Sequence, residues 1–247
     1  MKRLSTSVKI YIGLIVTLAI LAAINVFLPQ GSTVPAQEFP VSKPVFAFVV
    51  ASIMLLGYGG LGLLGMMFSH KLGFADLWCT TISVKQRLLI PTFIGAALGV
   101  FFILADAILS KFHTLGTIPH PPFPTSIVAS ASAGIGEEVI FRLFFISFWV
   151  WLISNVILKR KWQNQIFWIV AFGSAFAFAF AHVPSLMFLF GLKTIGDIPL
   201  ALMSEIILLN GVLSIVAAYY FKTYGFLSAV CIHFAADVVW HVIWGAL

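Results

Sequence analysis

Long apolar runs, separated by short polar segments, follow one another along the whole chain. Seven runs can be delimited, at residues 10–28, 45–68, 88–110, 126–158, 163–182, 199–221 and 225–247. A helix of about 20 apolar residues crosses the roughly 30 Å hydrocarbon core of a bilayer, and lipid offers the backbone no hydrogen-bond partner outside a helix or a closed barrel. The short alternating segments of a barrel are missing from the sequence. The pattern therefore predicts an all-α polytopic bundle of seven to eight transmembrane helices.

The fourth run, residues 126–158, is longer than one crossing requires. Its 33 residues would form a helix of roughly 50 Å, so it must tilt or break. Gly134-Ile135-Gly136 is the expected position of a break, and a re-entrant eighth segment near Gly134 stays open as an alternative.

Composition supports the membrane assignment, because 61% of the residues are hydrophobic and only 9% are charged. A soluble globular domain carries roughly a quarter charged residues. No internal repeat or soluble domain is visible, so we expect residues 1–247 to form a single integral membrane domain. The bilayer is its expected environment.

The net charge of +6 is better explained by membrane topology than by nucleic acid, because the basic residues cluster in loops on one side. With a cytoplasmic N-terminus, the cytoplasmic side carries Lys2, Arg3, Lys9, Lys71, Lys85, Arg87, Lys159, Arg160, Lys161 and Lys222. Only Lys43, Lys111 and Lys193 face the other side, and Arg142 lies within a run. We expect no nucleic-acid partner and place the N-terminus in the cytoplasm.

Ionisable side chains within the apolar runs are few, and each is costly in lipid. They are Asp106, Glu137, Glu138, Arg142, His182, Glu205, His233, Asp237 and His241. Each is therefore a candidate functional residue unless a structural role accounts for it.

The stretch Glu137-Glu138-Val139-Ile140-Phe141-Arg142 is the most informative. Glu138 and Arg142 stand four residues apart, with the acid first, which is the favourable order for an ion pair on a helix. One arginine needs one carboxylate, so Glu137, about 100° around the helix, is left for function. The alternative is that both glutamates merely neutralise Arg142.

Two later runs contribute histidines. His182 follows Phe178 by four residues and precedes Pro184, which ends a helix, and taken alone it is a common interfacial histidine. His233 and Asp237 form an i, i+4 pair deep in the last run. Two deep polar groups on one face favour function over a self-satisfied packing contact.

The remaining ionisable groups fit structural roles better. Asp106 and Glu205 fall near the expected ends of their runs, where we expect water to solvate them or a helix cap to use them. His241 stands four residues after Asp237 and is expected to be structural.

Glu137-Glu138 with Arg142, then Phe178 to His182, then His233 to Asp237, together resemble the three motifs of the CPBP family of intramembrane proteases. This family, also called Abi, includes type II CAAX prenyl endopeptidases and bacteriocin self-immunity proteins. The motifs occur in order on three separate runs, and they define an expected catalytic core at residues 126–247. The first three runs carry no motif.

The resemblance implies an endopeptidase that hydrolyses a peptide bond in a membrane-associated peptide or protein. Glu137 would activate a water, His182 would help to hold it, and His233 with the residue four further on would stabilise the oxyanion. Glu138 and Arg142 would fix the helix that presents Glu137. A bacterial cell membrane is the expected location.

Asp237 departs from the family pattern, because many relatives carry asparagine there. An ionised aspartate cannot donate a hydrogen bond to an oxyanion, so we expect Asp237 to act indirectly, by orienting and charging His233. No cofactor is expected, although Glu137, His182 and His233 could supply the ligands of a zinc site.

Two other functions remain open from the sequence. A non-enzymatic immunity or scaffold protein would keep Arg142 and a carboxylate but would not need Glu137, His182 and His233 together. A proton-coupled transporter also uses carboxylates and histidines in the membrane, but the sequence has no inverted repeat.

Overall fold

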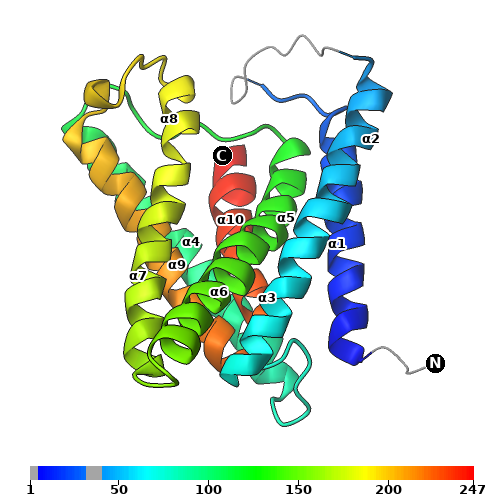
Figure 1. Cartoon of the computed structure of the whole chain (residues 1–247). Helices are drawn as coiled ribbons and strands as arrows, with labels where there is room; N and C mark the ends of the chain where they lie inside the picture. Colours follow the sequence, from blue (N-terminus) through cyan, green and yellow to red (C-terminus); the bar gives the residue numbers. More distant parts are fainter. Residues whose placement is uncertain (1–4, 32–40) are drawn as a thin grey trace.

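The computed structural model describes residues 5–31 and 41–247, and in these ranges all regular structure is helical (Figure 1). The principal helices are α1 (Thr6–Asn25), α2 (Lys43–Ile53), α3 (Gly59–Leu72), α4 (Ile90–Leu109), α5 (Thr125–Glu138), α6 (Ser147–Val150), α7 (Gln163–Ala181), α8 (Val183–Leu189), α9 (Leu200–Tyr224) and α10 (Phe226–Asp237). Wider π-helical turns occupy Met54–Tyr58, Lys85–Leu89, Val139–Ile146, Trp151–Ile157 and Val238–Ile243, and 3₁₀ turns occupy Ser110–Phe112, Ile195–Asp197 and Trp244–Ala246.

These elements join into membrane-spanning segments at the positions that hydropathy predicts. In the described ranges, seven helical segments are long and apolar enough to cross a bilayer: Thr6–Asn25, Lys43–Leu72, Lys85–Phe112, Thr125–Ile157, Gln163–Leu189, Leu200–Tyr224 and Phe226–Ala246. The all-α polytopic bundle is therefore confirmed. Lys2 and Arg3, which contribute to the orientation argument, lie outside the described residues, so the cytoplasmic N-terminus stays a prediction.

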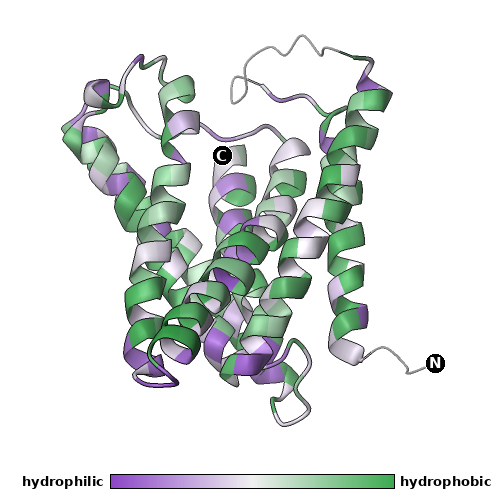
Figure 2. Ribbon diagram, in the orientation of Figure 1, coloured by the Kyte–Doolittle hydropathy of each residue, from purple (hydrophilic) through white to green (hydrophobic). Residues whose placement is uncertain are grey.

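The outer surface of the bundle is apolar, as a protein bathed in lipid requires. Large side chains such as Phe48, Leu56 and Phe93 are more than 70% exposed. Figure 2 shows hydrophobic residues covering the flanks of the helices, while hydrophilic positions recur inside the bundle along α5 and α10. An apolar surface of this extent marks a membrane-facing protein.

The expected break at Gly134–Gly136 is wrong. Helix α5 runs without interruption to Glu138 and only then widens into the π-helical turns of Val139–Ile146. The long span accommodates its length obliquely, as its course from α5 to α6 in Figure 1 shows. A Cβ atom on Gly134 would lie 3.1 Å from the Phe234 backbone nitrogen, so this glycine allows α10 to approach closely.

Helix α10 occupies the centre of the bundle and packs against α4, α5 and α9. The contact with α4 depends on Gly95 and Gly99, which have the small-xxx-small spacing of close transmembrane helix pairs. A Cβ atom on Gly95 would lie 2.2 Å from the Ile232 carbonyl oxygen, and one on Gly99 would lie 2.7 Å from that of Ala236. The backbones of the two helices therefore approach each other closely at Gly95 and Gly99.

Gly95→Val should lower the yield of folded protein, because the new side chain would meet the α10 backbone, which cannot rotate away. Overpacking of this kind typically costs about 1–3 kcal/mol. The measurement is monodisperse yield and thermal melting in detergent, with Gly60→Val as the matched control, since a Cβ atom on Gly60 meets nothing within 4 Å. Equal melting of the two variants would contradict this account of the α4–α10 contact.

Candidate active site

The two adjacent glutamates lie at the end of α5, where the helix widens into π-helical turns. Such turns in transmembrane helices frequently occur at functional sites. The side chain of Glu137 is 34% exposed, whereas that of Glu138 is fully buried. The side chain of Glu137 is therefore accessible, whereas that of Glu138 is enclosed by protein.

Glu138 contacts Arg142 as the sequence spacing leads one to expect. Its Oε1 lies 3.2 Å from Nη1 of Arg142, and neither side chain is exposed. The guanidinium also lies over the ring of Phe178, with 4.6 Å between Cζ and the ring centroid. Arg142 therefore joins α7 to the span that carries the glutamates.

Glu138 has a second partner that the sequence did not indicate. Its Oε1 lies 2.8 Å from Nδ1 of His233, at hydrogen-bonding distance, across 95 positions of sequence. A carboxylate can only accept, so Nδ1 of His233 carries the proton and donates it. One buried carboxylate thus binds both the arginine of its own span and the histidine of α10.

The other edge of the His233 ring faces two more carboxylates. Nε2 lies 3.7 Å from Oε2 of Glu137 and 3.6 Å from Oδ2 of Asp237. These distances exceed a direct hydrogen bond but allow strong electrostatic attraction when the ring is protonated. The residue at hydrogen-bonding distance that orients His233 is therefore Glu138 and not Asp237, contrary to the sequence-based expectation for Asp237.

His182 lies at the end of α7, next to the turn that leads into α8. Its Nδ1 lies 2.8 Å from the carbonyl oxygen of Phe178, one helical turn earlier. A carbonyl oxygen has no proton to give, so Nδ1 is the donor, and Nε2 of the neutral ring is left as an acceptor. The ring of Phe178 stands between the two histidines, edge-on to both His182 and His233.

These side chains meet at one cavity. A cavity of about 220 Å³ is lined by Glu137, His182, His233 and Asp237. The structure therefore brings together the four candidate catalytic residues, although they come from three spans.

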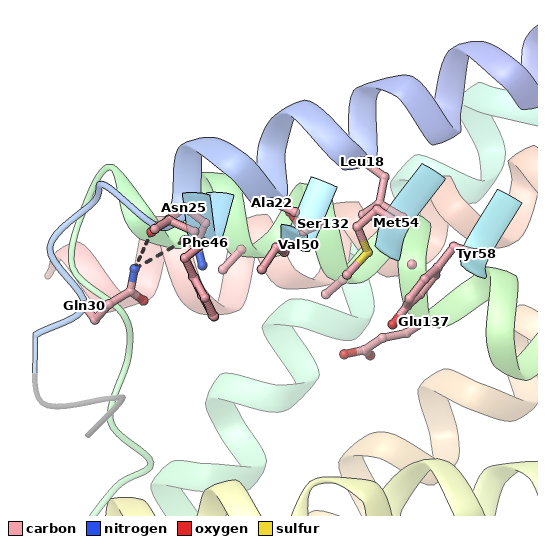
Figure 3. Close-up of a pocket in the computed structure, with 14 residues that line it drawn as sticks. Leu18, Ala22, Asn25, Gln30, Phe46, Val50, Met54, Tyr58, Ser132 and Glu137 are labelled. Carbon is pink, nitrogen blue, oxygen red and sulfur yellow. Dashed lines mark hydrogen bonds between the residues drawn. The ribbon is translucent and has the colours of Figure 1, made fainter. Parts of the chain in front are cut away.

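A second cavity, of about 530 Å³, opens on the other side of Glu137, between α1, α2 and α5. Figure 3 shows Tyr58 and Glu137 at one end of it and Asn25 and Gln30 at the other. Ala129, Ala133 and Glu137 line both cavities, so Glu137 stands at their junction.

Glu137, His182 and His233, the zinc ligands considered from the sequence, do not form a group of metal-ligating side chains in this arrangement. Across residues 5–31 and 41–247, no group of three His, Cys, Asp or Glu side chains is placed to hold a metal ion. We therefore derive no step through a metal.

The expectation that water solvates Asp106 and Glu205 is wrong. Asp106 is 1% exposed and Glu205 is fully buried, because the segment after α4 folds back over this end of α4 and α9. Oδ1 of Asp106 accepts a hydrogen bond from the backbone N–H of Ile118 at 3.1 Å, and the carboxyl group of Glu205 lies nearby. The position of Asp106 and Glu205 near the end of an apolar run did not reveal that the segment after α4 covers them.

His241 also borders the smaller cavity, where it contacts a histidine from the loop after α4. Its Nδ1 lies 3.0 Å from Nδ1 of His120. Burial lowers the pKa of His120, because the charged form would lose its hydration. A neutral His120 hydrogen-bonded to His241 closes this side of the cavity.

Comparison with known families identifies the second half of the chain. Residues 119–239 match the family model described as type II CAAX prenyl endopeptidase Rce1-like. The chain belongs to the CAAX protease family. The matched segment contains α5 to α10 with all three motifs, and it makes the chain a member of a family of membrane proteases. No curated protein and no solved structure matches the chain.

Arg142→Ala should reduce folded yield sharply, because it leaves Glu138 as a buried carboxylate with one partner fewer. Removing one member of a buried ion pair typically costs about 3–5 kcal/mol. Folded yield and melting in detergent are the measurements, and Glu137→Gln is the control, since it changes the half-exposed neighbour. If Arg142→Ala melts like Glu137→Gln, the pair does not hold the span in place.

Proposed function

We propose that this CAAX-family protein is an intramembrane endopeptidase that hydrolyses a peptide bond with a water activated by Glu137. The observation that carries the proposal is the position of Glu137, which alone of the two adjacent glutamates opens to a cavity, with His233 and Asp237 beside it. A general base must reach its water, and a buried Glu138 held by two partners cannot.

The surrounding charges support this division between the two glutamates. Glu138 forms an ion pair with Arg142 on one side and accepts a hydrogen bond from Nδ1 of His233 on the other. Because Oε1 of Glu138 accepts from its Nδ1, His233 is held in one orientation, and its Nε2 faces Glu137 and Asp237. A protonated His233 would then stabilise the ionised form of Glu137, the form that can take a proton.

The proposed reaction has two steps. In the first, the Glu137 carboxylate takes a proton from a water whose other hydrogen is accepted by Nε2 of His182, and the water oxygen adds to the peptide carbonyl carbon. The carbonyl oxygen becomes an oxyanion. In the second, the oxyanion collapses, the carbon–nitrogen bond breaks, and the leaving nitrogen receives the proton from Glu137. The products are a carboxylic acid and an amine, and Glu137 is restored.

Asp237 is assigned a charge-balancing role in this proposal, in place of the orienting role expected from the sequence. Its Oδ2 lies on the Nε2 side of His233, next to Glu137. There it favours the protonated ring that Glu137 faces, while Glu138 fixes the ring's orientation. An asparagine of the same size could keep the contact without the charge.

We propose a membrane-associated peptide or protein as the substrate, since the cavities lie within the spanning segments. The family name points to peptides with a prenylated Cys-aliphatic-aliphatic-X terminus, and such peptides are the first to be tested. We also propose that the N-terminus faces the cytoplasm, because this orientation places most basic loops there.

Glu137→Gln should abolish cleavage while leaving folding intact, because glutamine keeps the size but cannot accept a proton. The loss in turnover should be at least about a hundredfold, the usual contribution of a general base. The measurement uses quenched-fluorescent Cys-aliphatic-aliphatic-X peptides, farnesylated and unmodified, with protein in liposomes.

Glu137→Asp is the companion variant, since it keeps the base but shortens its reach. We expect it to retain partial activity. A Glu137→Gln protein that cleaves like wild type would rule out the glutamate mechanism, and a wild-type protein that cleaves none of the peptides while still binding them would favour a non-enzymatic scaffold or immunity role.

Asp237→Asn should leave substantial activity, because asparagine keeps a polar group beside Nε2 of His233. Asp237→Ala should lose about a hundredfold or more, because it removes one of the two polar groups there and leaves only Glu137. Turnover of the three proteins from pH 5 to 9, at matched folded yield, is the measurement. Equal activity of wild type and Asp237→Ala would contradict this prediction and would indicate that the His233–Asp237 pair is only a packing contact.

A further inference from the structure

The cavity that holds Glu137 contains an asparagine that belongs to none of the three motifs. Asn210 lies in α9 and borders the cavity together with Glu137 and His182. An amide within a transmembrane helix is costly unless its hydrogen-bonding groups are used. Asn210 does not stand out in the sequence, because no ionisable residue stands three or four positions from it in α9.

The proposed reaction requires a hydrogen-bond donor that the motif residues do not readily supply. When water adds to the peptide carbonyl, a full negative charge develops on its oxygen, and donors aimed at that oxygen provide much of the catalysis. A suitable donor is neutral or positive and has no carboxylate beside it, since a carboxylate would repel the oxyanion.

His233 is poorly suited to this task. Its Nδ1 donates to Glu138, and its Nε2 stands between Glu137 at 3.7 Å and Asp237 at 3.6 Å. An oxyanion bound at Nε2 would lie beside two carboxylates. The His233 ring is therefore placed to stabilise the two carboxylates electrostatically, and it is poorly placed to stabilise the oxyanion.

Three other polar side chains of this cavity, His182, Ser130 and His241, have their donors engaged elsewhere or present an acceptor. His182 presents Nε2 as an acceptor when neutral, because its proton is on Nδ1. The hydroxyl of Ser130 donates to the Ser126 carbonyl, and Nδ1 of His241 contacts His120. The ring of Trp240, in the turns that follow α10, packs edge-on against His120.

The side-chain amide of Asn210 has a second N–H group that is available as a donor. Its Nδ2 donates one hydrogen to the Ile206 carbonyl oxygen at 3.0 Å, one turn earlier in α9, and within the described part of the chain the second hydrogen has no partner. The bond to Ile206 fixes the plane of the amide. The group is neutral, preorganised and placed at the wall of the cavity that contains Glu137.

We propose that Asn210 is a catalytic residue of this site, and that the second N–H of its amide donates to the oxyanion formed at the scissile carbonyl. The inference rests on the proposed function, because it needs the water-addition step. No proton is transferred by Asn210, which keeps both hydrogens throughout. The stabilisation arises only as charge develops on the carbonyl oxygen, so it lowers the barrier without tightening substrate binding.

The test compares Asn210→Ala, Asn210→Asp and Asn210→Gln on the peptide that wild type cleaves. We expect Asn210→Ala and Asn210→Asp to lose about a hundredfold to a thousandfold in kcat with little change in KM, the pattern of a lost oxyanion donor. Asn210→Asp matches the size of asparagine but places an acceptor where the donor was. Asn210→Gln keeps an amide and should recover part of the activity.

Asn155→Ala and Asn155→Asp are the matched controls, because Asn155 is also a half-buried asparagine in a spanning segment but does not border this cavity. Both should turn over like wild type at matched folded yield. If Asn210→Ala fails to fold, Asn210→Asp and Asn210→Gln carry the comparison, since they preserve the packed volume more closely.

A binding measurement separates an oxyanion donor from a packing residue. A phosphonate analogue of the cleaved peptide carries a tetrahedral anion in place of the scissile carbonyl. Its affinity should fall in Asn210→Ala by about the same factor as kcat, while binding of the uncleaved peptide to Glu137→Gln and to the Asn210→Ala, Glu137→Gln double variant should be equal.

The outcomes distinguish the two proposals. If Glu137→Gln is inactive while Asn210→Ala stays within about threefold of wild type in kcat, the oxyanion role of Asn210 is overturned and the glutamate mechanism stands. Loss of uncleaved-peptide binding in the double variant would also overturn it, in favour of a packing role. If Glu137→Gln cleaves normally, the proposed function fails, and the role of Asn210 fails with it.

Discussion

The cost of an uncompensated charge in hydrocarbon governs the arrangement of this bundle. Arg142 is fully buried, and moving its guanidinium away from a carboxylate would cost several kcal/mol. Glu138 meets that requirement and is itself held by His233, while Phe178 covers the guanidinium. These contacts join the span of α5, α7 and α10 at one point. The open position of Glu137 depends on its neighbour carrying the structural charge.

Close backbone packing makes that junction possible. Helix α10 reaches the glutamates only because glycines remove side chains from its path, at Gly95 and Gly99 on α4 and at Gly134 on α5. In lipid, the hydrophobic effect does not drive helices to associate. Close van der Waals packing between the helices stabilises their association instead. His233 lies in the part of α10 bounded by these contacts, and its position is set by backbone geometry as much as by charge.

Patterns along one helix predicted the contacts within that helix, but they did not reveal which side chains of different helices touch. Hydropathy located the spans, and i, i+4 spacing indicated the contact of Glu138 with Arg142. The bond from Glu138 to His233 joins positions 95 residues apart, and no periodicity encodes it. Asp106 and Glu205 were misread for a related reason, since distance from the end of a span does not reveal which loop covers it.

The three motif-free spans also contribute to the site. The first two build the larger cavity together with α5, and the third contributes Phe102 to the smaller one. The hydroxyl of Tyr11 in α1 donates to the Tyr58 carbonyl at 2.7 Å, which fixes the π-helical turn beside Glu137. An endopeptidase must accept chain on both sides of the bond that it cuts. A carboxylate at the junction of two cavities meets this requirement, whereas a proton relay needs only a line of titratable groups. The first half of the chain therefore supports the endopeptidase proposal, although none of its residues belongs to the family motifs.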